Sequence, residues 1–305
     1  MIREICNSSH RTQSPGFSEW WYFHFLDEGG RTINAVLHET DIFGIEKSPY
    51  ISLSFLVNPG EQAHHSVPLK HVKIGKSGKF LVVPNGVVKE DKNSLAFSFF
   101  FNNAGIEGRI RKLSQPLIIN KSVLYQDELG RKSHWVVQTP FGQFKGKLKA
   151  NGTSKRIKGS IYQDHQWGDL PIQEFATDWI WGHFGNELIS VIFFKILTRK
   201  GELINRAGIV GTNLFTSSTQ VETEFLDTLA NQKMPEEASS VAQIILDGGY
   251  YLSFQVEPKN LIRSRVDEQH NGFRASYLRW SSLAQYEAHN LKYKLNGITE
   301  YLRIR

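Results

Sequence analysis

The sequence predicts an all-β protein with two packed antiparallel domains, each of them a barrel or a sandwich. Short apolar runs rich in β-branched and aromatic residues recur along the chain, separated by Gly, Asn or Pro. Aromatic residues make up 12% of the 305 residues, which favours sheets or a site for an apolar ligand. Near the middle, the polar stretch KANGTSKRIKGS interrupts the pattern. We expect the crossover between two domains there, with domains over residues 1–153 and 154–305.

The first predicted element is a hairpin. An aromatic strand over residues 20–26 is followed by the turn sequence DEGG and by a second strand over residues 33–42. Because side chains alternate along a strand, Trp20, Tyr22 and His24 share one face, and aromatic residues also occupy the other face. The strand therefore needs packing partners on both sides, or a core on one side and a ligand on the other.

Further strands are predicted in order through both halves. In the first half the runs are YISLSFLV, FLVVPNGVV, LAFSFFF, SVLYQDELG and HWVVQTPFGQFKGKL. In the second half they are DWIWGHFG, LISVIFFKILT, INRAGIVGTN, SVAQIILDGG, YYLSFQV, FRASYLRWSSLAQYEA and LKYKLNGITEYLRIR. Helix is expected only within residues 226–245, where Pro235 would limit its length. Barrels of about eight strands can enclose one small apolar ligand, so this architecture favours hydrophobic small molecules.

Charge and cysteine content narrow the class of protein. Hydrophobic residues make up 40% and charged residues 22%, as in a folded soluble protein. The net charge of +6 is dispersed along the sequence, so we expect no nucleic-acid partner. The single cysteine, Cys6, excludes an internal disulfide and fits a reducing compartment. No signal-peptide run and no stretch of about 18 apolar residues is present, so we expect a cytoplasmic protein without a membrane span.

Three ordered motifs carry a resemblance to a known family. The first hairpin begins SEWWYF, the middle of the chain contains IYQDHQWGD followed by DWIWGHFG, and the last strand carries GITEYLRIR. This combination, from Glu19 to about Glu300, resembles the lipocalin-like superfamily of AttH-type proteins and carotenoid 1,2-hydratases, and it is similar to the fungal decalin-forming Diels-Alderases. The resemblance implies two lipocalin-like (calycin-type) antiparallel β domains and chemistry on a hydrophobic substrate.

The sequence departs from the family pattern at positions that bear on function. Gln163 and Gln166 stand where the family usually has histidine and asparagine. For the hydratases, the resemblance implies an aspartate on the strand after Trp-x-Trp-Gly as the group that protonates the alkene. Here that strand is LISVIFFKIL, and Lys195 is its only ionisable residue. The missing acid weighs against carotenoid hydration.

Asp164 and His165 of the central motif are the first candidate catalytic residues. A buried carboxyl group that stays protonated can supply the acid that an unactivated alkene needs. Alternatively, Asp164 pins a corner that starts the second domain by accepting backbone N–H groups. Neighbouring strand residues point to opposite sides, so we expect His165 and Trp167 to face a ligand, while Asp164 anchors a turn at Gly168.

The remaining candidates are hydrogen-bond donors and aromatic walls. Tyr22 and Lys195 are candidate catalytic donors, and the candidate substrate-binding residues are Trp20, His24, His38, Trp167, Trp179 and Trp181. Each tryptophan taken singly also suits a core, but the Trp-rich strands that open the two domains would together wall an aromatic cleft between them. His24 and His38 lie on paired strands and would meet across the hairpin.

No motif in the sequence indicates a metal or a cofactor. His64 and His65 lie in a loop-like stretch, and no histidine stands in a pattern of carboxylates or cysteines that binds zinc. The sequence also contains no phosphate-binding glycine loop and no nucleophile motif. We therefore expect chemistry without a cofactor, or binding alone.

The leading functional hypothesis is a cofactor-independent cyclase, an isomerase of the Diels-Alderase type. It would promote an intramolecular [4+2] ring closure of a hydrophobic polyketide or terpenoid polyene in antibiotic or other secondary metabolism, which requires a cavity and one donor. One alternative is an alkene hydratase or lyase with Asp164 as the acid and His165 managing water. The other is a lipid or isoprenoid carrier with no chemistry. Substrate, stereochemistry and oligomeric state are left open.

Overall fold

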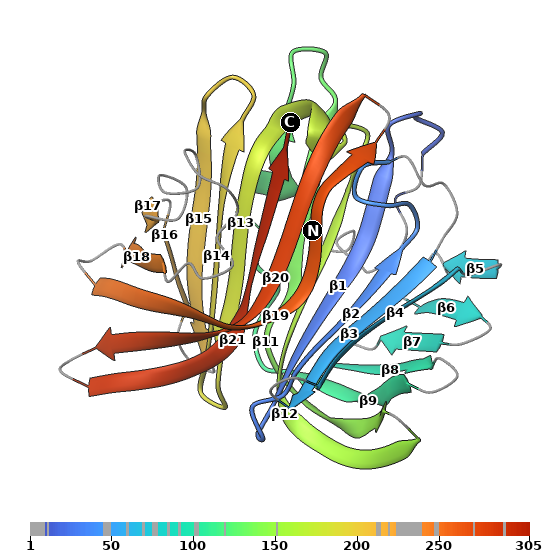
Figure 1. Ribbon diagram of the computed structural model, residues 1–305, viewed down its shortest axis with the longest axis vertical. Helices are drawn as coiled ribbons and strands as arrows, with labels where there is room; N and C mark the ends of the chain where they lie inside the picture. Colours follow the sequence, from blue (N-terminus) through green and yellow to red (C-terminus); the bar gives the residue numbers. More distant parts are fainter. Residues whose placement is uncertain are drawn as a thin grey trace. The chain divides into compact units, whose positions relative to one another are not determined.

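The computed structural model confirms the all-β prediction and contains two antiparallel sheets (Figure 1). It describes residues 10, 12–44, 50–58, 61–68, 71–74, 79–83, 86–90, 93–100, 104–118, 120–150, 152–211, 215–218, 220–223, 240–246, 250–270, 272–288 and 291–305. Cys6 lies outside the described residues. No helix in the described part of the chain is long and apolar enough to cross a membrane.

The first sheet has twelve strands in the order β4-β3-β2-β1-β12-β11-β9-β8-β7-β6-β5, and β10 pairs with β11. Its strands are β1 (Ser18–Asp27), β2 (Thr32–His38), β3 (Tyr50–Asn58), β4 (Glu61–Pro68), β5 (His71–Ile74), β6 (Lys79–Val83), β7 (Gly86–Glu90), β8 (Ser94–Phe100), β9 (Ala104–Lys112), β10 (Val123–Gln126), β11 (Lys132–Ala150) and β12 (Thr153–Gly168). The two short helices are η1 (Asn120–Ser122) and α1 (Ile172–Phe175).

The second sheet has nine strands in the order β16-β15-β14-β13-β21-β20-β19-β18-β17. Its strands are β13 (Ala176–Gly185), β14 (Ile189–Thr198), β15 (Leu203–Gly211), β16 (Phe215–Ser218), β17 (Gln220–Thr223), β18 (Ser240–Leu246), β19 (Tyr250–His270), β20 (Phe273–Ala288) and β21 (Leu291–Ile304). Of the segment expected to hold a helix, residues 240–245 lie in strand β18 and residues 226–239 lie outside the described residues.

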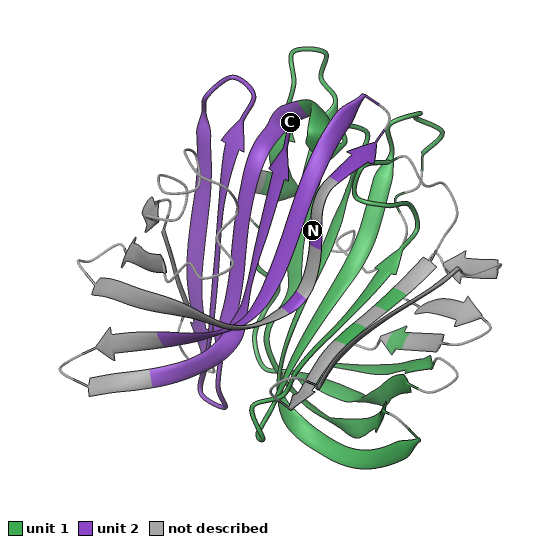
Figure 2. Cartoon of the chain, viewed as in Figure 1, with its two compact units in different colours: residues 1–55, 63–174 green, residues 56–62, 175–305 purple. Residues whose placement is uncertain are grey.

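The chain divides into two compact units at a different place from the one expected. One unit comprises residues 1–55 and 63–174, and the other residues 56–62 and 175–305 (Figure 2). The polar stretch KANGTSKRIKGS is not a crossover, because it forms the hairpin between β11 and β12 inside the first unit. Gly152 turns that hairpin with a φ of 77°. Within this stretch Ile157 is buried between the exposed Arg156 and Lys158, which is the pattern of a strand with one solvent face.

The predicted first hairpin is confirmed. β1 and β2 pair from Trp20 opposite His38 to Leu26 opposite Thr32, and every residue of β1 is buried. One face of β1 carries the core of the first unit, where the rings of Phe25 and Phe144 lie 5.1 Å apart. Burying a phenylalanine in this way contributes roughly 1.5–3 kcal/mol to folding.

Two local expectations were wrong. The second strand of the hairpin ends at His38 instead of running to residue 42, because the chain turns there and the Glu39 N–H donates to the Glu19 carbonyl at 2.9 Å. His64 and His65 lie on strand β4 and not in a loop.

Candidate functional site

The first two sequence motifs meet on neighbouring strands of the first unit. β1, which carries the Glu-Trp-Trp-Tyr motif, pairs antiparallel with β12, which carries Asp-His-x-Trp-Gly, and the two strands lie side by side in Figure 1. Trp21 lies opposite His165, and Tyr22 lies opposite Asp164. Residues directly opposite in a sheet point to the same face, so His165 and Asp164 belong to opposite faces.

A buried carboxylate–imidazole couple lies on the His165 face. The Glu19 Oε1 atom lies 2.9 Å from His165 Nε2, and both side chains are completely buried. The same Oε1 accepts the backbone N–H of His10 at 2.8 Å, and the Glu19 N–H donates to Thr40 Oγ1 at 3.0 Å. A carboxylate only accepts hydrogen bonds, so the couple places a proton on His165 Nε2. We call Glu19 and His165 the buried couple.

Aromatic rings enclose the buried couple. The His165 ring stacks on Trp21 with centroids 4.5 Å apart, and it lies 4.8 Å from the ring of Trp167. Trp167 in turn stacks on two imidazole rings. Its ring centroid lies 4.0 Å from that of His10 and 5.0 Å from that of His134. The expectation that His165 and Trp167 share a face is confirmed. In this structure they face the rings of their own unit.

The two histidines that sandwich Trp167 are neutral near pH 7. The pKa of His10 is lowered to about 4, chiefly by burial and also by the neighbouring His165, against the opposing effect of Glu19. Burial also lowers the pKa of His134, together with the nearby Lys132 ammonium. Neutral imidazoles stack on an indole without bringing a desolvated charge into the cluster.

The opposite face of the same strands carries tyrosines and Asp164, and we call it the tyrosine face. The Tyr162 hydroxyl donates to Asp164 Oδ2 at 2.7 Å, and the Tyr22 hydroxyl donates to Asn34 Oδ1 at 3.0 Å. The two phenol rings meet edge to face with centroids 6.4 Å apart. Five of the predicted site residues lie on this face, and all are buried: Trp20, Tyr22, His24, His38 and Asp164.

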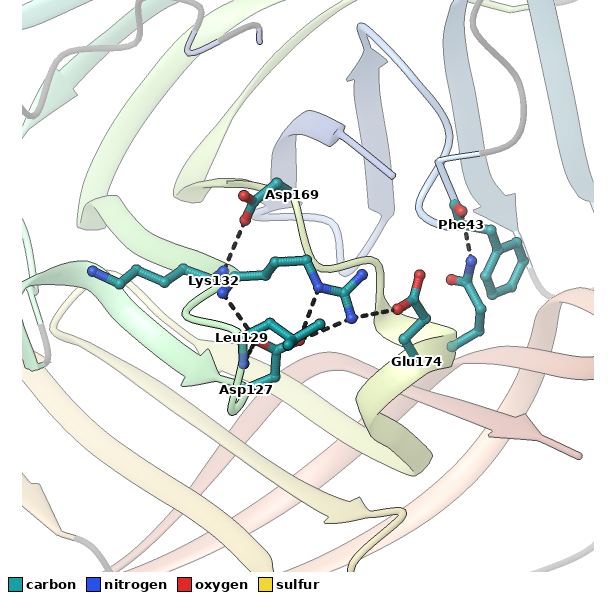
Figure 3. Close-up of polar contacts among 8 residues, drawn as sticks. Phe43, Asp127, Leu129, Lys132, Asp169 and Glu174 are labelled. Atoms are coloured by element: carbon teal, nitrogen blue, oxygen red, sulfur yellow. Dashed lines mark hydrogen bonds and ion pairs between the residues drawn. The ribbon is translucent and has the colours of Figure 1, made fainter. Parts of the chain in front are cut away.

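Asp164 does not anchor a corner, which corrects the structural role expected for it. β12 stays extended through Gly168, and the corner follows that residue. Asp169 is the residue that pins the corner, because its Oδ1 accepts the backbone N–H of Lys132 at 2.8 Å (Figure 3). The alternation along an uninterrupted strand keeps Asp164 and His165 on opposite faces.

Side chains from separate segments hold the chain after this corner. Arg131 forms ion pairs with Asp127 at 2.8 Å and with Glu174 of α1 at 2.7 Å, and Gln173 Nε2 donates to the Phe43 carbonyl at 2.8 Å (Figure 3). These bonds fasten the segment that leads out of the first unit onto the β10–β11 turn and onto the loop after β2. The cluster is a structural clasp.

The glycines of the two central motifs are required by close packing and not by a turn. A Cβ atom on Gly168 would overlap the backbone carbonyl of Lys132 on the adjacent strand. A Cβ atom on Gly182, the glycine of Trp-x-Trp-Gly, would overlap the ring of Phe193. Both residues have ordinary extended backbone within their strands, so it is the missing side chain that matters.

In the second unit, Lys195 and the two tryptophans of Trp-x-Trp-Gly lie on opposite faces. Trp179 and Trp181 alternate on β13 and share a face, as expected. Lys195 on β14 lies directly opposite Ile180, the residue between the tryptophans, and so takes the other face. The three residues therefore do not line one common face of the sheet.

The face that carries Lys195 also carries a buried charge cluster. Asp178 Oδ1 accepts a hydrogen bond from the Tyr301 hydroxyl at 2.6 Å and from Arg303 Nε at 2.9 Å. Burial, and then the bond to Asp178, raise the pKa of Tyr301 well above its usual value, so the phenol stays protonated. Lys195 is 8% exposed and forms no hydrogen bond or ion pair among the described residues. Within the described part of the chain this nearly buried ammonium therefore forms no ion pair, although the Asp178 carboxylate lies on the same face.

The face that carries the tryptophans also carries two pairs of polar side chains that contact each other. Arg279 Nε donates to Glu300 Oε1 at 2.6 Å, and Glu300 lies directly opposite Trp181. His183 Nε2 lies 2.9 Å from Ser190 Oγ, and burial lowers the pKa of His183 to about 3. His183 is therefore neutral at physiological pH.

The structure thus distributes the predicted residues over four faces. Trp20, Tyr22, His24, His38 and Asp164 share the tyrosine face, and His165 and Trp167 lie on the face of the buried couple. In the second unit, Trp179 and Trp181 share one face and Lys195 takes the other. Glu19, His10 and Tyr162 were not among the residues predicted from the sequence. Glu19 had a signal, because it opens the first motif immediately before the two tryptophans. No group of three or more metal-ligating side chains occurs among the described residues.

No family model and no curated protein matches the sequence. Solved structures nevertheless share its fold. CghA has a TM-score of 0.70 at 11% identity, over 95% of this chain and 88% of CghA, and CghA is also known in complex with Sch210972. AttH from Nitrosomonas europaea has a TM-score of 0.64 at 11% identity, over 94% of this chain and 92% of AttH. Kievitone hydratase from Nectria haematococca has a TM-score of 0.55 at 14% identity, over 96% and 90%. The chain therefore has the lipocalin-like fold of AttH-like proteins.

Proposed function

We propose that this protein is a cofactor-independent cyclase that closes a ring in a hydrophobic polyene by an intramolecular [4+2] reaction. In such a reaction two carbon–carbon σ bonds and one new π bond replace three π bonds, and no atom enters or leaves. The protein has to hold the chain folded and to polarise the alkene that accepts the diene. One hydrogen bond to a carbonyl conjugated with that alkene meets the second need.

The observation that carries the proposal is the state of Lys195. Of the three donors named from the sequence, the Tyr22 hydroxyl is engaged by Asn34 and His165 Nε2 is engaged by Glu19. Lys195 forms no hydrogen bond within the described part of the chain, and it is nearly buried. A nearly buried ammonium group is strongly stabilised by an added oxygen acceptor. A substrate carbonyl would supply that acceptor.

The position of Lys195 also favours cyclisation over hydration. It lies on the strand after Trp-x-Trp-Gly, where the resemblance to the hydratases implies a carboxylic acid. A protonated lysine donates a hydrogen bond well but is a weak acid toward an unactivated alkene. Trp179 and Trp181 lie on the face of their sheet opposite Lys195, and Trp20 and Trp167 lie on opposite faces of the first sheet, so the four tryptophans do not share one face with the proposed donor. The role of each as a wall of the substrate site stays a prediction.

Solved structures with this fold support binding of a ligand. CghA is known with bound Sch210972, and a hydratase shares the fold. The hydrophobic polyene as substrate of this chain is part of our proposal. A role in natural-product biosynthesis belongs to the same proposal.

The alternative is an alkene hydratase, and the Tyr162–Asp164 pair is the observation that favours it. A carboxyl group with 2% exposure beside two tyrosines is a possible proton donor. However, Asp164 Oδ2 accepts a hydrogen bond from the Tyr162 hydroxyl in this structure, which is the role of a carboxylate oxygen. The acid function would need the opposite arrangement.

Product analysis separates these functions. The purified protein is incubated with a linear polyene that carries a carbonyl-conjugated alkene, and products are identified by mass. Cyclisation leaves the mass unchanged and shortens the conjugated system, whereas hydration adds one water. Asp164→Asn should keep most cyclase activity in a protein that still folds, but it should abolish a hydratase. A carrier would return the polyene unchanged.

A further inference from the structure

The outer face of four strands of the first unit is strongly basic. Lysines and arginines that are dispersed in the sequence alternate with buried residues, so each strand turns its cations to solvent. We call this surface the basic face, and its cations are Lys89 on β7, Arg109 and Arg111 on β9, Lys145, Lys147 and Lys149 on β11, and Arg156 and Lys158 on β12. These positive charges are dispersed along the sequence, but strand pairing brings them together on one surface.

The register places these cations directly beside one another. Arg109 on β9 lies opposite Lys145 on β11, and Lys145 lies opposite Lys158 on β12. In the next row, Lys147 lies opposite Arg156. Neighbouring strands are about 5 Å apart and alternate residues of one strand about 7 Å apart, so the cations form a dense lattice.

Few anions compensate the basic face. Glu107 lies 3.7 Å from Lys147, and Glu28 lies 2.8 Å from Lys158. Arg109 and Lys145 form no ion pair among the described residues, although both are exposed. Like charges directly opposite in a sheet destabilise it. The arrangement therefore has a folding cost that an interaction partner would offset.

We propose that the basic face docks the protein on the surface of an anionic lipid bilayer. Interrupted by Glu107 beside Lys147, the cations cover a broad area of regular sheet, which complements an extended array of negative headgroups. Each lysine or arginine held near such a membrane adds to the attraction, and a cluster of this number is enough for reversible binding.

Features of the basic face favour a bilayer over nucleic acid. Between the cations, outward positions such as Ala96 and Ser98 on β8 and Gln143 on β11 carry small or polar side chains, and Phe100 at the end of β8 adds one ring that lies over Gly105. A single ring at the end of a strand does not form the row of aromatic platforms on which successive bases stack. Docking through the basic face does not depend on the proposed reaction. If the substrate is a hydrophobic polyene, the same bilayer is where that polyene dissolves.

Vesicle co-sedimentation tests the proposal with a matched pair of variants. The wild-type chain should bind phosphatidylcholine vesicles that contain phosphatidylserine, should release them at high salt, and should ignore vesicles of phosphatidylcholine alone. The variant Arg109→Glu/Lys145→Glu should lose at least about thirtyfold in affinity. The control Lys200→Glu/Lys294→Glu makes the same change in net charge at exposed positions of the second unit and should bind like the wild type.

Two results would overturn the proposal. One is an equal loss in both variants, because binding would then follow net charge and not the basic face. The other is a higher affinity for double-stranded DNA or for polyglutamate than for anionic vesicles at the same salt, since the partner would then be a nucleic acid or an acidic protein. Arg109→Gln/Lys145→Gln, with thermal unfolding as a check, replaces the glutamate variant if that variant does not fold.

Discussion

Replacing Glu19 with alanine should unfold the first unit far more easily, because the buried couple cannot tolerate the loss of one partner. Glu19 Oε1 accepts hydrogen bonds from two groups, His165 Nε2 at 2.9 Å and the His10 N–H at 2.8 Å, and neither Glu19 nor His165 has any exposed side-chain surface. Breaking a buried pair of this kind costs about 3–5 kcal/mol, since the remaining polar group stays desolvated. We expect Glu19→Ala to lower the free energy of unfolding by about 4 kcal/mol.

Glu19→Gln is a milder substitution at the same position and should cost less stability than Glu19→Ala. Its amide oxygen still accepts from His165 but carries no charge, so the expected loss is about 1–2 kcal/mol, the difference between a charged and a neutral hydrogen bond. The assay is equilibrium unfolding in urea followed by tryptophan fluorescence, because Trp21 and Trp167 both contact His165.

The control for this series is Glu107→Ala. Glu107 pairs with Lys147 at 3.7 Å, and its side chain is 41% exposed, so removing it should cost no more than about 1 kcal/mol. Equal losses for Glu19→Ala and Glu107→Ala would refute the assignment of Glu19 and His165 as a structural fastening between β1 and β12. A Glu19→Ala variant that keeps full stability but loses activity would also refute this structural assignment.

Three further predictions follow from single positions. Burial lowers the pKa of His183 from 6.5 to about 3, so its stabilising contribution is fully present above pH 6.5 and is lost as the pH falls toward 3. Unfolding measured across that window should show a stability slope of up to about 1.4 kcal/mol per pH unit, which His183→Gln flattens. Gly168→Ala should cost about 3 kcal/mol or more in urea unfolding, because its Cβ would overlap the Lys132 carbonyl, and an unchanged midpoint would contradict this. Lys145→Glu should instead raise the stability by about 0.5–1 kcal/mol, since it turns a like-charge contact with Arg109 into an attractive one; a lower melting temperature would show that the contact is not repulsive.

Local patterns in the sequence were sufficient for the elements that depend on alternation alone. The aromatic residues on both faces of β1 required burial on both sides, and all of β1 is buried. Alternation likewise placed His165 with Trp167 and Trp179 with Trp181. These predictions hold because side-chain direction along one strand needs no knowledge of the neighbouring strand.

Predictions that required the pairing of distant strands were less successful. Lys195 was expected as a hydrogen-bond donor in a site walled by Trp179 and Trp181, but the register of β13 and β14 puts it on the face opposite the two tryptophans. That register follows an irregularity between Ala176 and Asp178, which no local pattern reveals. The basic face arises in the same way, because the row of Arg109, Lys145 and Lys158 exists only once β9, β11 and β12 are paired.

The corner after β12 shows why a motif can be assigned to the wrong residue. Asp164, His165 and Gly168 together suggested a turn with Asp164 as its acceptor. The structure places the turn after Gly168 and gives the acceptor role to Asp169. Gly168 is needed because β11 passes close to it, and a contact with a strand so distant in sequence cannot be read from the residues beside it.

The most direct test of the proposed reaction is the rate of ring closure catalysed by Lys195→Met. The variant keeps an unbranched side chain of similar length but has no hydrogen-bond donor. With a polyene whose reacting alkene is conjugated to a carbonyl, we expect kcat to fall by roughly a hundredfold, the usual effect of removing one preorganised donor to a developing charge. Lys195→Arg, which retains a cationic donor, should keep a measurable part of the wild-type rate. A Lys195→Met variant that folds and cyclises the polyene at the wild-type rate would contradict the assignment of Lys195 as the donor.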